Sequence, residues 1–203
     1  MPVYEAKEWT HLWYDEAKDE ITPRAMLIGD SITAGYTQPV NRSLGNALRA
    51  DSIAGSKGLD HPFYNEEVDL FARQFGFSYR IIHFNNGLHG FHLDAQTYGQ
   101  LYEEKIIWLR ARFPHAVLTL ATSTSIVLTE GDRLPNPEKN AVVLARNEQV
   151  WRLADKDGLP VDDLYAAMLD HPEWRSGDPY HYNEQGTQAQ GDLVAAFLLN
   201  HIK

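Results

Sequence analysis

Two short stretches carry the residues with the clearest chemical potential. "GDSIT" at 29–33 presents a serine directly after an apolar run, and "DPYH" at 178–181 places an aspartate three residues before a histidine. Side chains three residues apart in a helix-like turn reach the same region, so Asp178 is suited to orient the His181 imidazole. An imidazole held in this way takes a proton from a serine hydroxyl. Ser31, His181 and Asp178 are therefore candidates for nucleophilic catalysis.

Each stretch also has a structural interpretation. Serine is a common helix cap, and Ser31 with Thr33 and Thr37 has the composition of a loop that binds a flavin phosphate at a helix N-terminus. Asp178 and Asn183 are equally suited to start a turn and to cap a helix. The Gly-x-Ser-x-Gly elbow is absent because Thr33 occupies the position of its second glycine, which disfavours an α/β-hydrolase. The residues alone leave catalysis and phosphate binding open.

The elements that must position these residues alternate along the chain. Apolar and β-branched runs predict strands at 25–28, 48–55, 77–84, 116–123 and 159–164. Helical periodicity predicts helices near 40–50, 62–76, 94–113, 136–158 and 184–202, with a further helix in the N-terminal extension 1–22. This alternation is typical of a parallel sheet with helices on both faces. We predict an α/β fold, a three-layer flavodoxin-like α/β/α sandwich with about five parallel strands, in a single domain over 1–203.

Four polar stretches fall in loops, mostly just after predicted strands. Because a parallel sheet brings the carboxyl ends of its strands to one edge, these loops are expected to meet there. Together they supply a serine, glycines with free N–H groups, asparagines, histidines and an aspartate, which are the groups needed for acyl transfer through a covalent intermediate. The stretches are "GDSITAG" (29–35), "GSKGLDHP" (55–62), "NNGLHGFH" (85–92) and "DPYHYNEQG" (178–186).

The order of "GDSIT" and "DPYH" resembles the SGNH, or GDSL-like, hydrolase family, over about residues 25–190. In that family the serine after Gly-Asp is the nucleophile and a late Asp-x-x-His completes the triad. The resemblance implies that Ser31 is the nucleophile, His181 the general base and then acid, and Asp178 its orienting partner. It further implies a serine esterase that needs no metal or cofactor.

The resemblance also implies an oxyanion hole built from three loops. The N–H of Ser31 is one donor, and Gly58 in "GSKG" is the expected second donor. The family usually has Gly-x-Asn-Asp in the third loop, whereas this chain has "GLHG", so His89 stands where the asparagine is expected. A neutral imidazole donates one N–H and is able to replace the amide. The alternative is that Asn86 supplies the amide and His89 lines the substrate pocket.

Several neighbours of these motifs are assigned to substrate binding, namely Asp30, His92 and Tyr180. His89, His92 and Asp94 also suggest a metal site, but a single His-x-x-His without a second ligand cluster is a poor one, so no metal is predicted. His83 lies within an apolar strand and is expected to be a core histidine.

Composition limits the classes of partner. The net charge of −10, from 28 acidic and 18 basic residues, argues against nucleic acid and anionic membranes. The absence of cysteine excludes disulfides and thiolate nucleophiles. The N-terminus has no apolar signal region, so a cytoplasmic location is expected, although a secreted protein without its signal peptide would look the same. The oligomeric state does not follow from the sequence.

The expected substrate is a small-molecule or carbohydrate ester. The short chain leaves little room for a lid over a long acyl group, which favours short acyl esters and above all O-acetyl groups on carbohydrates. A lysophospholipase or thioesterase activity is the alternative within the same family, and acyl transfer to another hydroxyl also stays open. The alternative of another class is a non-catalytic flavodoxin-like binding module.

Overall fold

A six-stranded sheet organises the chain, of which the computed structural model describes residues 3–202. Along the sheet the strand order is β1-β3-β2-β4-β5-β6, and only β1 is antiparallel to its neighbour. The parallel strands therefore follow the flavodoxin-like order, and the predicted α/β sandwich is confirmed. The strands are β1 (Thr10–Trp13), β2 (Arg24–Gly29), β3 (Arg49–Gly55), β4 (Tyr79–Phe84), β5 (Val117–Ala121) and β6 (Val161–Asp162).

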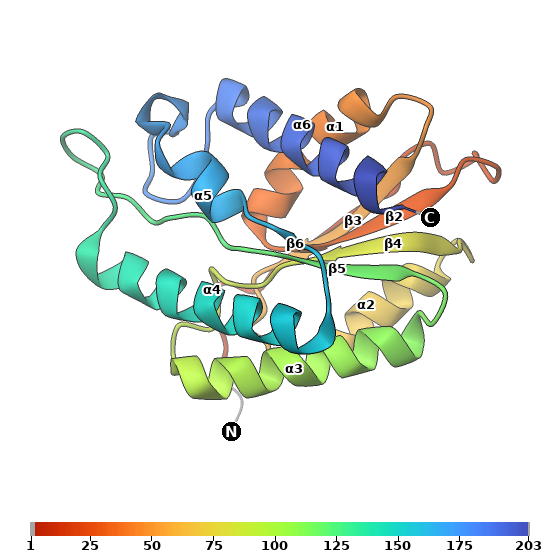
Figure 1. Cartoon of the computed structure of the whole chain (residues 1–203), viewed down its shortest axis with the longest axis horizontal. Coiled ribbons are helices and arrows are strands. Elements are labelled where there is room, and N and C mark those ends of the chain that lie inside the picture. The colour runs from red at the N-terminus through yellow and green to blue at the C-terminus, as the bar shows by residue number, and fades with distance from the viewer. Residues whose placement is uncertain (1–2, 203) are drawn as a thin grey trace.

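Helices cover both faces of this sheet (Figure 1). One layer contains α1 (Ser31–Leu44), α5 (Leu164–Leu169) and α6 (Glu184–His201), and the other contains α2 (Tyr64–Arg73), α3 (Ala95–Arg112) and α4 (Pro137–Asp157). A short 3-10 helix, Pro172–Trp174, precedes α6. Over residues 3–202 none of the helices combines the length and apolar composition needed to cross a bilayer.

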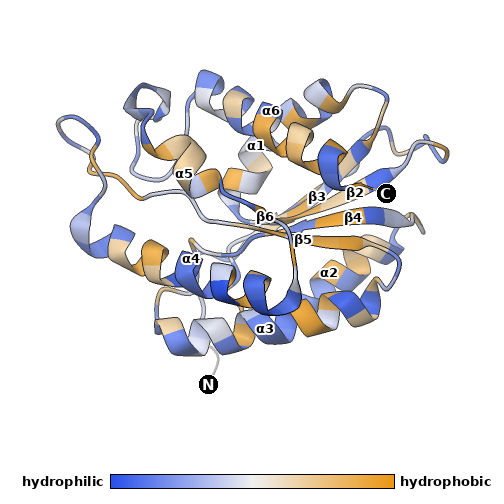
Figure 2. Ribbon diagram, in the orientation of Figure 1, coloured by the Kyte–Doolittle hydropathy of each residue, from blue (hydrophilic) through white to orange (hydrophobic). Residues whose placement is uncertain are grey.

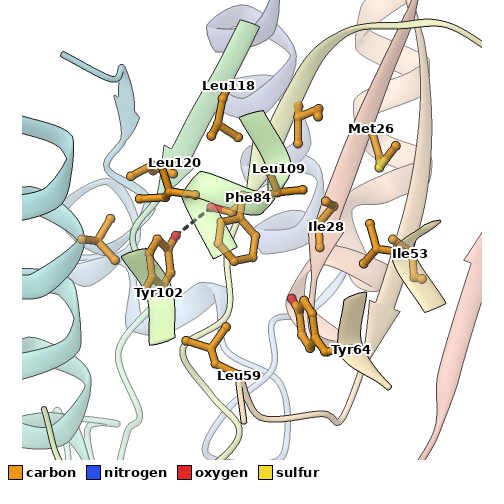
Figure 3. Packing of buried hydrophobic residues seen from close by; sticks show 14 of the residues in the cluster. Met26, Ile28, Ile53, Leu59, Tyr64, Phe84, Tyr102, Leu109, Leu118 and Leu120 are labelled. Carbon is orange, nitrogen blue, oxygen red and sulfur yellow. Dashed lines mark hydrogen bonds between the residues drawn. The ribbon is translucent and has the colours of Figure 1, made fainter. Parts of the chain in front are cut away.

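The hydrophobic core lies on both sides of the sheet because strand side chains alternate between its faces. In β2, Met26 and Ile28 pack toward α2, α3 and α4, whereas Ala25 and Leu27 belong to the cluster under α1 and α6. Figure 2 shows apolar residues concentrated along the strands and the inner sides of the helices. In the first cluster the Tyr102 hydroxyl donates to a backbone carbonyl of β4 at 3.1 Å (Figure 3). The core therefore fixes α3 against the sheet by packing and by a hydrogen bond.

The predicted N-terminal helix within 1–22 is wrong for the residues that the structure describes. Thr10–Trp13 is instead an edge strand, with Thr10 opposite Gly55 and Trp13 opposite Ser52. The spacing of tryptophans and leucine fits a helix equally well, but the free edge of β3 offers backbone groups that need partners. Pairing with that edge decides the conformation. Residues 1 and 2 lie outside the described residues.

The first helix begins earlier than predicted. The polar composition around Pro39 suggests a loop before residue 40, yet α1 runs from Ser31 and includes Pro39. The helix tolerates this proline in a close contact with α6, where a Cβ on Gly191 would lie 2.3 Å from the Pro39 Cβ. Packing of α1 against α6 thus overrides the local tendency of proline to end a helix.

A buried ion pair fastens β2 to β3. Arg24 is 2% exposed, and its Nη1 donates to Asp51 Oδ1 at 2.7 Å. Burial raises the pKa of Asp51 to about 6, although Arg24 opposes the shift. We expect Arg24→Met to lower the free energy of unfolding by about 3–5 kcal/mol at pH 7, because it leaves a buried carboxylate without its partner. Urea denaturation measures this change.

The pH dependence of that loss has a definite sign. A carboxyl whose folded pKa is raised stabilises the fold below its unfolded pKa and loses that contribution as pH rises through the folded pKa. Protonation of Asp51 thus relieves the variant, and the deficit of Arg24→Met shrinks between pH 7 and pH 5. As a control, Arg49→Met removes a partly exposed arginine paired with Asp15 and Asp19 and is expected to cost about 0–1 kcal/mol. Equal losses in both variants would contradict this account.

Candidate active site

The serine motif lies at the point where the strand order reverses. From β2 the chain crosses to β3 on one side, while β4 lies on the other side of β2. Ligands of open α/β sheets bind at this switch point, outside the carboxyl ends of the strands. β2 ends at Gly29 and β4 ends at Phe84, so the serine loop and the "NNGLHG" loop meet at the same edge.

The turn between β2 and α1 presents Ser31 as the first residue of a helix. Asp30 is the N-cap, and its carboxylate accepts the N–H of Ile32 at 3.0 Å. Gly29 has no room for a side chain, since a Cβ there would lie 2.0 Å from Thr33 Oγ1. Ser31 therefore sits at the positive end of a helix, where negative charge is stabilised.

Ser31, His181 and Asp178 form a continuous chain of hydrogen bonds. The Ser31 Oγ lies 2.7 Å from His181 Nε2, and His181 Nδ1 lies 2.7 Å from Asp178 Oδ2. The other carboxylate oxygen of Asp178 accepts the backbone N–H of Tyr180 at 2.7 Å and of His181 at 2.8 Å. With a hydrogen on Nδ1 held by Asp178, the Nε2 atom is free to accept the serine proton.

The electrostatics of Asp178 suit this arrangement. Burial raises its pKa, but the hydrogen bonds from the His181 backbone and imidazole and from the Tyr180 N–H outweigh burial and lower the pKa to about 2. The carboxylate is therefore ionised at neutral pH. The side chains of His181 and Asp178 are 43% and 47% exposed, so the hydrogen-bonded chain opens to solvent.

Asp30 does not have the surroundings of a substrate-binding residue. It is 1% exposed, and burial raises its pKa against the opposing effect of His89, of backbone N–H groups and of His181. The predicted contact of Asp30 with substrate is therefore corrected. One of its carboxylate oxygens caps α1, and the side chain is buried from solvent.

The loops after β3 and β4 touch backbone to backbone. A Cβ on Gly58 would lie 3.0 Å from the Gly90 Cα, and Gly90 has a φ of +65°, where side chains are strained. The Asn86 amide donates to the Lys57 carbonyl at 2.9 Å. That carbonyl and the Gly58 N–H belong to the same planar peptide group. Asn86 therefore fixes the direction of the Gly58 N–H, which the family resemblance implies as an oxyanion donor.

His89 lies in the same loop cluster, half-buried and close enough to Asp30 to influence its pKa. Two residues that lie outside the sequence motifs contact His89 and its loop. Glu5 Oε1 lies 3.6 Å from His89 Nδ1, and Arg146 Nη1 donates to the His89 carbonyl at 2.7 Å. Arg146 is 57 residues away in sequence, so only the tertiary structure brings it to the loop.

His92 and Tyr180 have protein partners near the site. His92 Nε2 lies 2.8 Å from Asp60 Oδ2, in the loop after β3. The Tyr180 hydroxyl bonds with Lys139 Nζ at 3.2 Å, and the tyrosine ring centroid lies 6.4 Å from that of His181. Tyr180 thus borders the hydrogen-bonded chain directly, whereas His92 borders the loop that carries Gly58. Their contact with substrate stays a prediction.

The structure also gives protein partners to residues that were considered for a metal site and to His83. Asp94 caps α3 by accepting the Thr97 N–H at 2.8 Å. His92 is paired with Asp60, so these two residues, considered together as metal ligands from the sequence, bind different protein partners. His83 is fully buried with Nε2 3.1 Å from Asp162 Oδ2, which confirms it as a core histidine.

The threonine hydroxyls needed for phosphate binding at the start of α1 are occupied by partners within the helix. Thr33 and Thr37 are both buried. Thr33 Oγ1 lies 3.0 Å from the Tyr36 hydroxyl, and Thr37 Oγ1 donates to the Thr33 carbonyl at 2.7 Å. Neither side chain faces a ligand at the start of α1.

Comparison with known proteins gives a consistent result. The model of the GDSL-like lipase/acylhydrolase family matches residues 27–189. A comparison with curated protein sequences finds no significant match. An acetyl xylan esterase structure is 19% identical, with a TM-score of 0.66 over 86% of this chain and 99% of that chain.

Two further solved structures show the same architecture. A carbohydrate acetylesterase from Sinorhizobium meliloti is 10% identical, with a TM-score of 0.68 over 88% of this chain and 99% of its own. The C-terminal catalytic domain of peptidoglycan O-acetyltransferase A from Streptococcus pneumoniae is 20% identical, with a TM-score of 0.63 over 89% of this chain and 94% of its own. At these identities the likeness shows the fold.

Proposed function

Because the chain belongs to the GDSL-like lipase/acylhydrolase family, we propose that it is a serine esterase that removes short acyl groups, above all O-acetyl groups on carbohydrates. The family supports a carboxylic-ester hydrolase. The observation that carries the catalytic assignment is the hydrogen-bonded chain from Ser31 through His181 to Asp178.

The proposed reaction has two steps. Ser31 Oγ attacks the ester carbonyl while its proton passes to His181 Nε2, and the collapse of the tetrahedral intermediate releases the alcohol, which takes that proton. His181 then removes a proton from water, the hydroxide attacks the acyl-enzyme, and the free acid leaves as Ser31 regains its proton. Asp178 keeps the imidazole in the required orientation throughout and needs to remain ionised.

Three groups are proposed to stabilise the oxyanion. They are the Ser31 N–H at the start of α1, the Gly58 N–H and the His89 imidazole. Asn86 is the weaker candidate for the third position because one of its amide hydrogens is bound to the Lys57 carbonyl. In this proposal Asn86 supports the Gly58 peptide, and His89 replaces the asparagine that the family usually carries.

Two observations support a carbohydrate ester as substrate. The side chains of His181 and Asp178 are 43% and 47% exposed, which suits an acetyl group on a large alcohol better than an acyl chain that must be enclosed. Two of the similar structures are described as an acetyl xylan esterase and a carbohydrate acetylesterase. We therefore place acetylated carbohydrate ahead of lysophospholipid or thioester substrates.

The test compares hydrolysis of p-nitrophenyl acetate, butyrate and octanoate, followed by release of acetate from acetylated xylan. We expect kcat/KM to be at least about ten-fold higher for acetate than for octanoate, because a longer chain finds no enclosing pocket at an exposed site. Release of acetate from the polysaccharide would support the carbohydrate assignment. A preference for octanoate would instead favour the lysophospholipase or thioesterase alternative.

A further inference from the structure

The N-terminal segment 3–9 lies on the two loops that supply the proposed oxyanion donors. The Trp9 N–H donates to Ser56 Oγ at 2.9 Å, and the Ser56 N–H donates back to the Trp9 carbonyl at 3.2 Å. The Tyr4 ring meets the His61 ring edge-on, with centroids 5.3 Å apart. The segment thus docks on the loop after β3, next to the proposed Gly58 donor.

Glu5 extends this docking to the loop after β4. Its Oε1 accepts the Gly90 N–H at 2.9 Å and lies 3.6 Å from His89 Nδ1. The Glu5 backbone N–H donates to Glu8 Oε1 at 2.8 Å, which fixes the segment locally. The Trp9 ring also meets the His89 ring edge-on at 6.3 Å. The Nδ1 side of the imidazole therefore faces a carboxylate.

The backbone of the same loop is held from α4. Arg146 is 1% exposed, and it donates to the carbonyls of Gly87 at 2.9 Å, His89 at 2.7 Å and Gly90 at 2.6 Å. A buried guanidinium with three carbonyl partners fixes the loop against the body of the protein. The main chain of His89 is thus set by Arg146, while the direction of its ring is left to other contacts.

We infer that Glu5 is a positioning residue for the reaction, holding the His89 imidazole by Nδ1 so that Nε2 donates to the oxyanion. The inference rests on the proposed function. An imidazole that meets a carboxylate at Nδ1 and an oxyanion at Nε2 donates to both when it is doubly protonated. The charged groups around His89 are Glu5 from the N-terminal segment, Asp30 from the β2–α1 turn and Arg146, which contacts its backbone.

A double-mutant cycle between Glu5 and His89 tests this assignment. In the wild-type background Glu5→Gln should lower kcat for p-nitrophenyl acetate about ten-fold with little change in KM, a part of the 10²–10³-fold that an oxyanion donor contributes. In the His89→Asn background, where an amide needs no carboxylate partner, the same substitution should change kcat less than about two-fold. Equal losses in both backgrounds would assign Glu5 a structural role and overturn the inference.

The matched control is Glu8→Gln. Glu8 accepts the Glu5 N–H in the same segment and the Ser56 hydroxyl after β3, and within residues 3–202 its bonds do not involve His89. Its substitution should leave kcat within about two-fold of wild type, because the segment remains docked by the Trp9 backbone. An equal loss in Glu8→Gln would show that docking of the segment, and not the carboxylate at His89, determines the rate.

A measurement without turnover separates this inference from the proposed function. The ring ¹⁵N resonances of His89, identified by their absence in His89→Asn, should shift in Glu5→Gln and stay in place in Glu8→Gln. Unchanged His89 resonances in Glu5→Gln would overturn the inference even in an active esterase. If the His89 resonances shifted in a protein that hydrolyses no ester, the contact between Glu5 and His89 would be supported and only the proposed function would be refuted.

Discussion

Ser31→Ala is expected to lower kcat for p-nitrophenyl acetate by about 10⁵–10⁶-fold, since removal of a serine nucleophile abolishes the covalent route and leaves only binding and oxyanion stabilisation. The fold should be unaffected. The Ser31 hydroxyl bonds with the partly exposed His181 side chain, and alanine is a good helix former at the start of α1. Initial rates and a thermal melt of the same sample measure both quantities.

The matched control for Ser31→Ala is Ser43→Ala in the same helix. The Ser43 hydroxyl bonds with Asp192 on the surface, far along α1 from the proposed triad, so its loss should leave kcat within about two-fold. If Ser31→Ala kept the wild-type rate, the nucleophile would be another residue and the proposed triad would be wrong. A burst of p-nitrophenol equal to the enzyme concentration would directly reveal the acyl-enzyme.

Asp178→Asn is expected to lower kcat by about 10³–10⁴-fold without unfolding the protein. The asparagine oxygen is able to accept the two backbone N–H groups that Asp178 Oδ1 accepts now. Its NH₂ group then faces His181 Nδ1 and donates to it, which places the ring hydrogen on Nε2. An imidazole in this tautomer is unable to take the proton of Ser31.

The low pKa of Asp178 adds a pH dependence to this prediction. Because the pKa is about 2, the carboxylate stays ionised between pH 5 and 8, and the loss of rate in Asp178→Asn should be present at every pH in that range. A depressed pKa stabilises the fold above the unfolded value and loses this contribution as pH falls through about 2. Asp192→Asn, an exposed substitution on α6, is the control. A loss of rate that vanished at pH 5 would refute the role of an ionised Asp178.

The sequence by itself determined the fold class and the order of the catalytic candidates. Strand and helix patterns predicted an α/β sandwich. The ends of α3 and α4 were close to prediction because Asp94, Pro137 and Gly158 signal helix boundaries locally, and the start of α6 was close because Asn183 caps it. "GDSIT" and "DPYH" pointed to Ser31, His181 and Asp178, and the structure places them within hydrogen-bonding distance. These signals are local, because each depends on residues a few positions apart.

Contacts between distant segments decided the rest. The edge of β3 makes a strand of Thr10–Trp13, and Gly191 lets α6 pack closely on α1 at Pro39. Likewise, Glu5 bonds with Gly90, which lies 85 residues away in the sequence, and Arg146 bonds with His89, which lies 57 residues away. No spacing rule predicts such contacts, since they exist only after the strand order has brought the loops to one edge. The sequence determined which groups are present, and the tertiary structure decided that the Asn86 amide bonds with the Lys57 carbonyl while His89 lies beside Glu5.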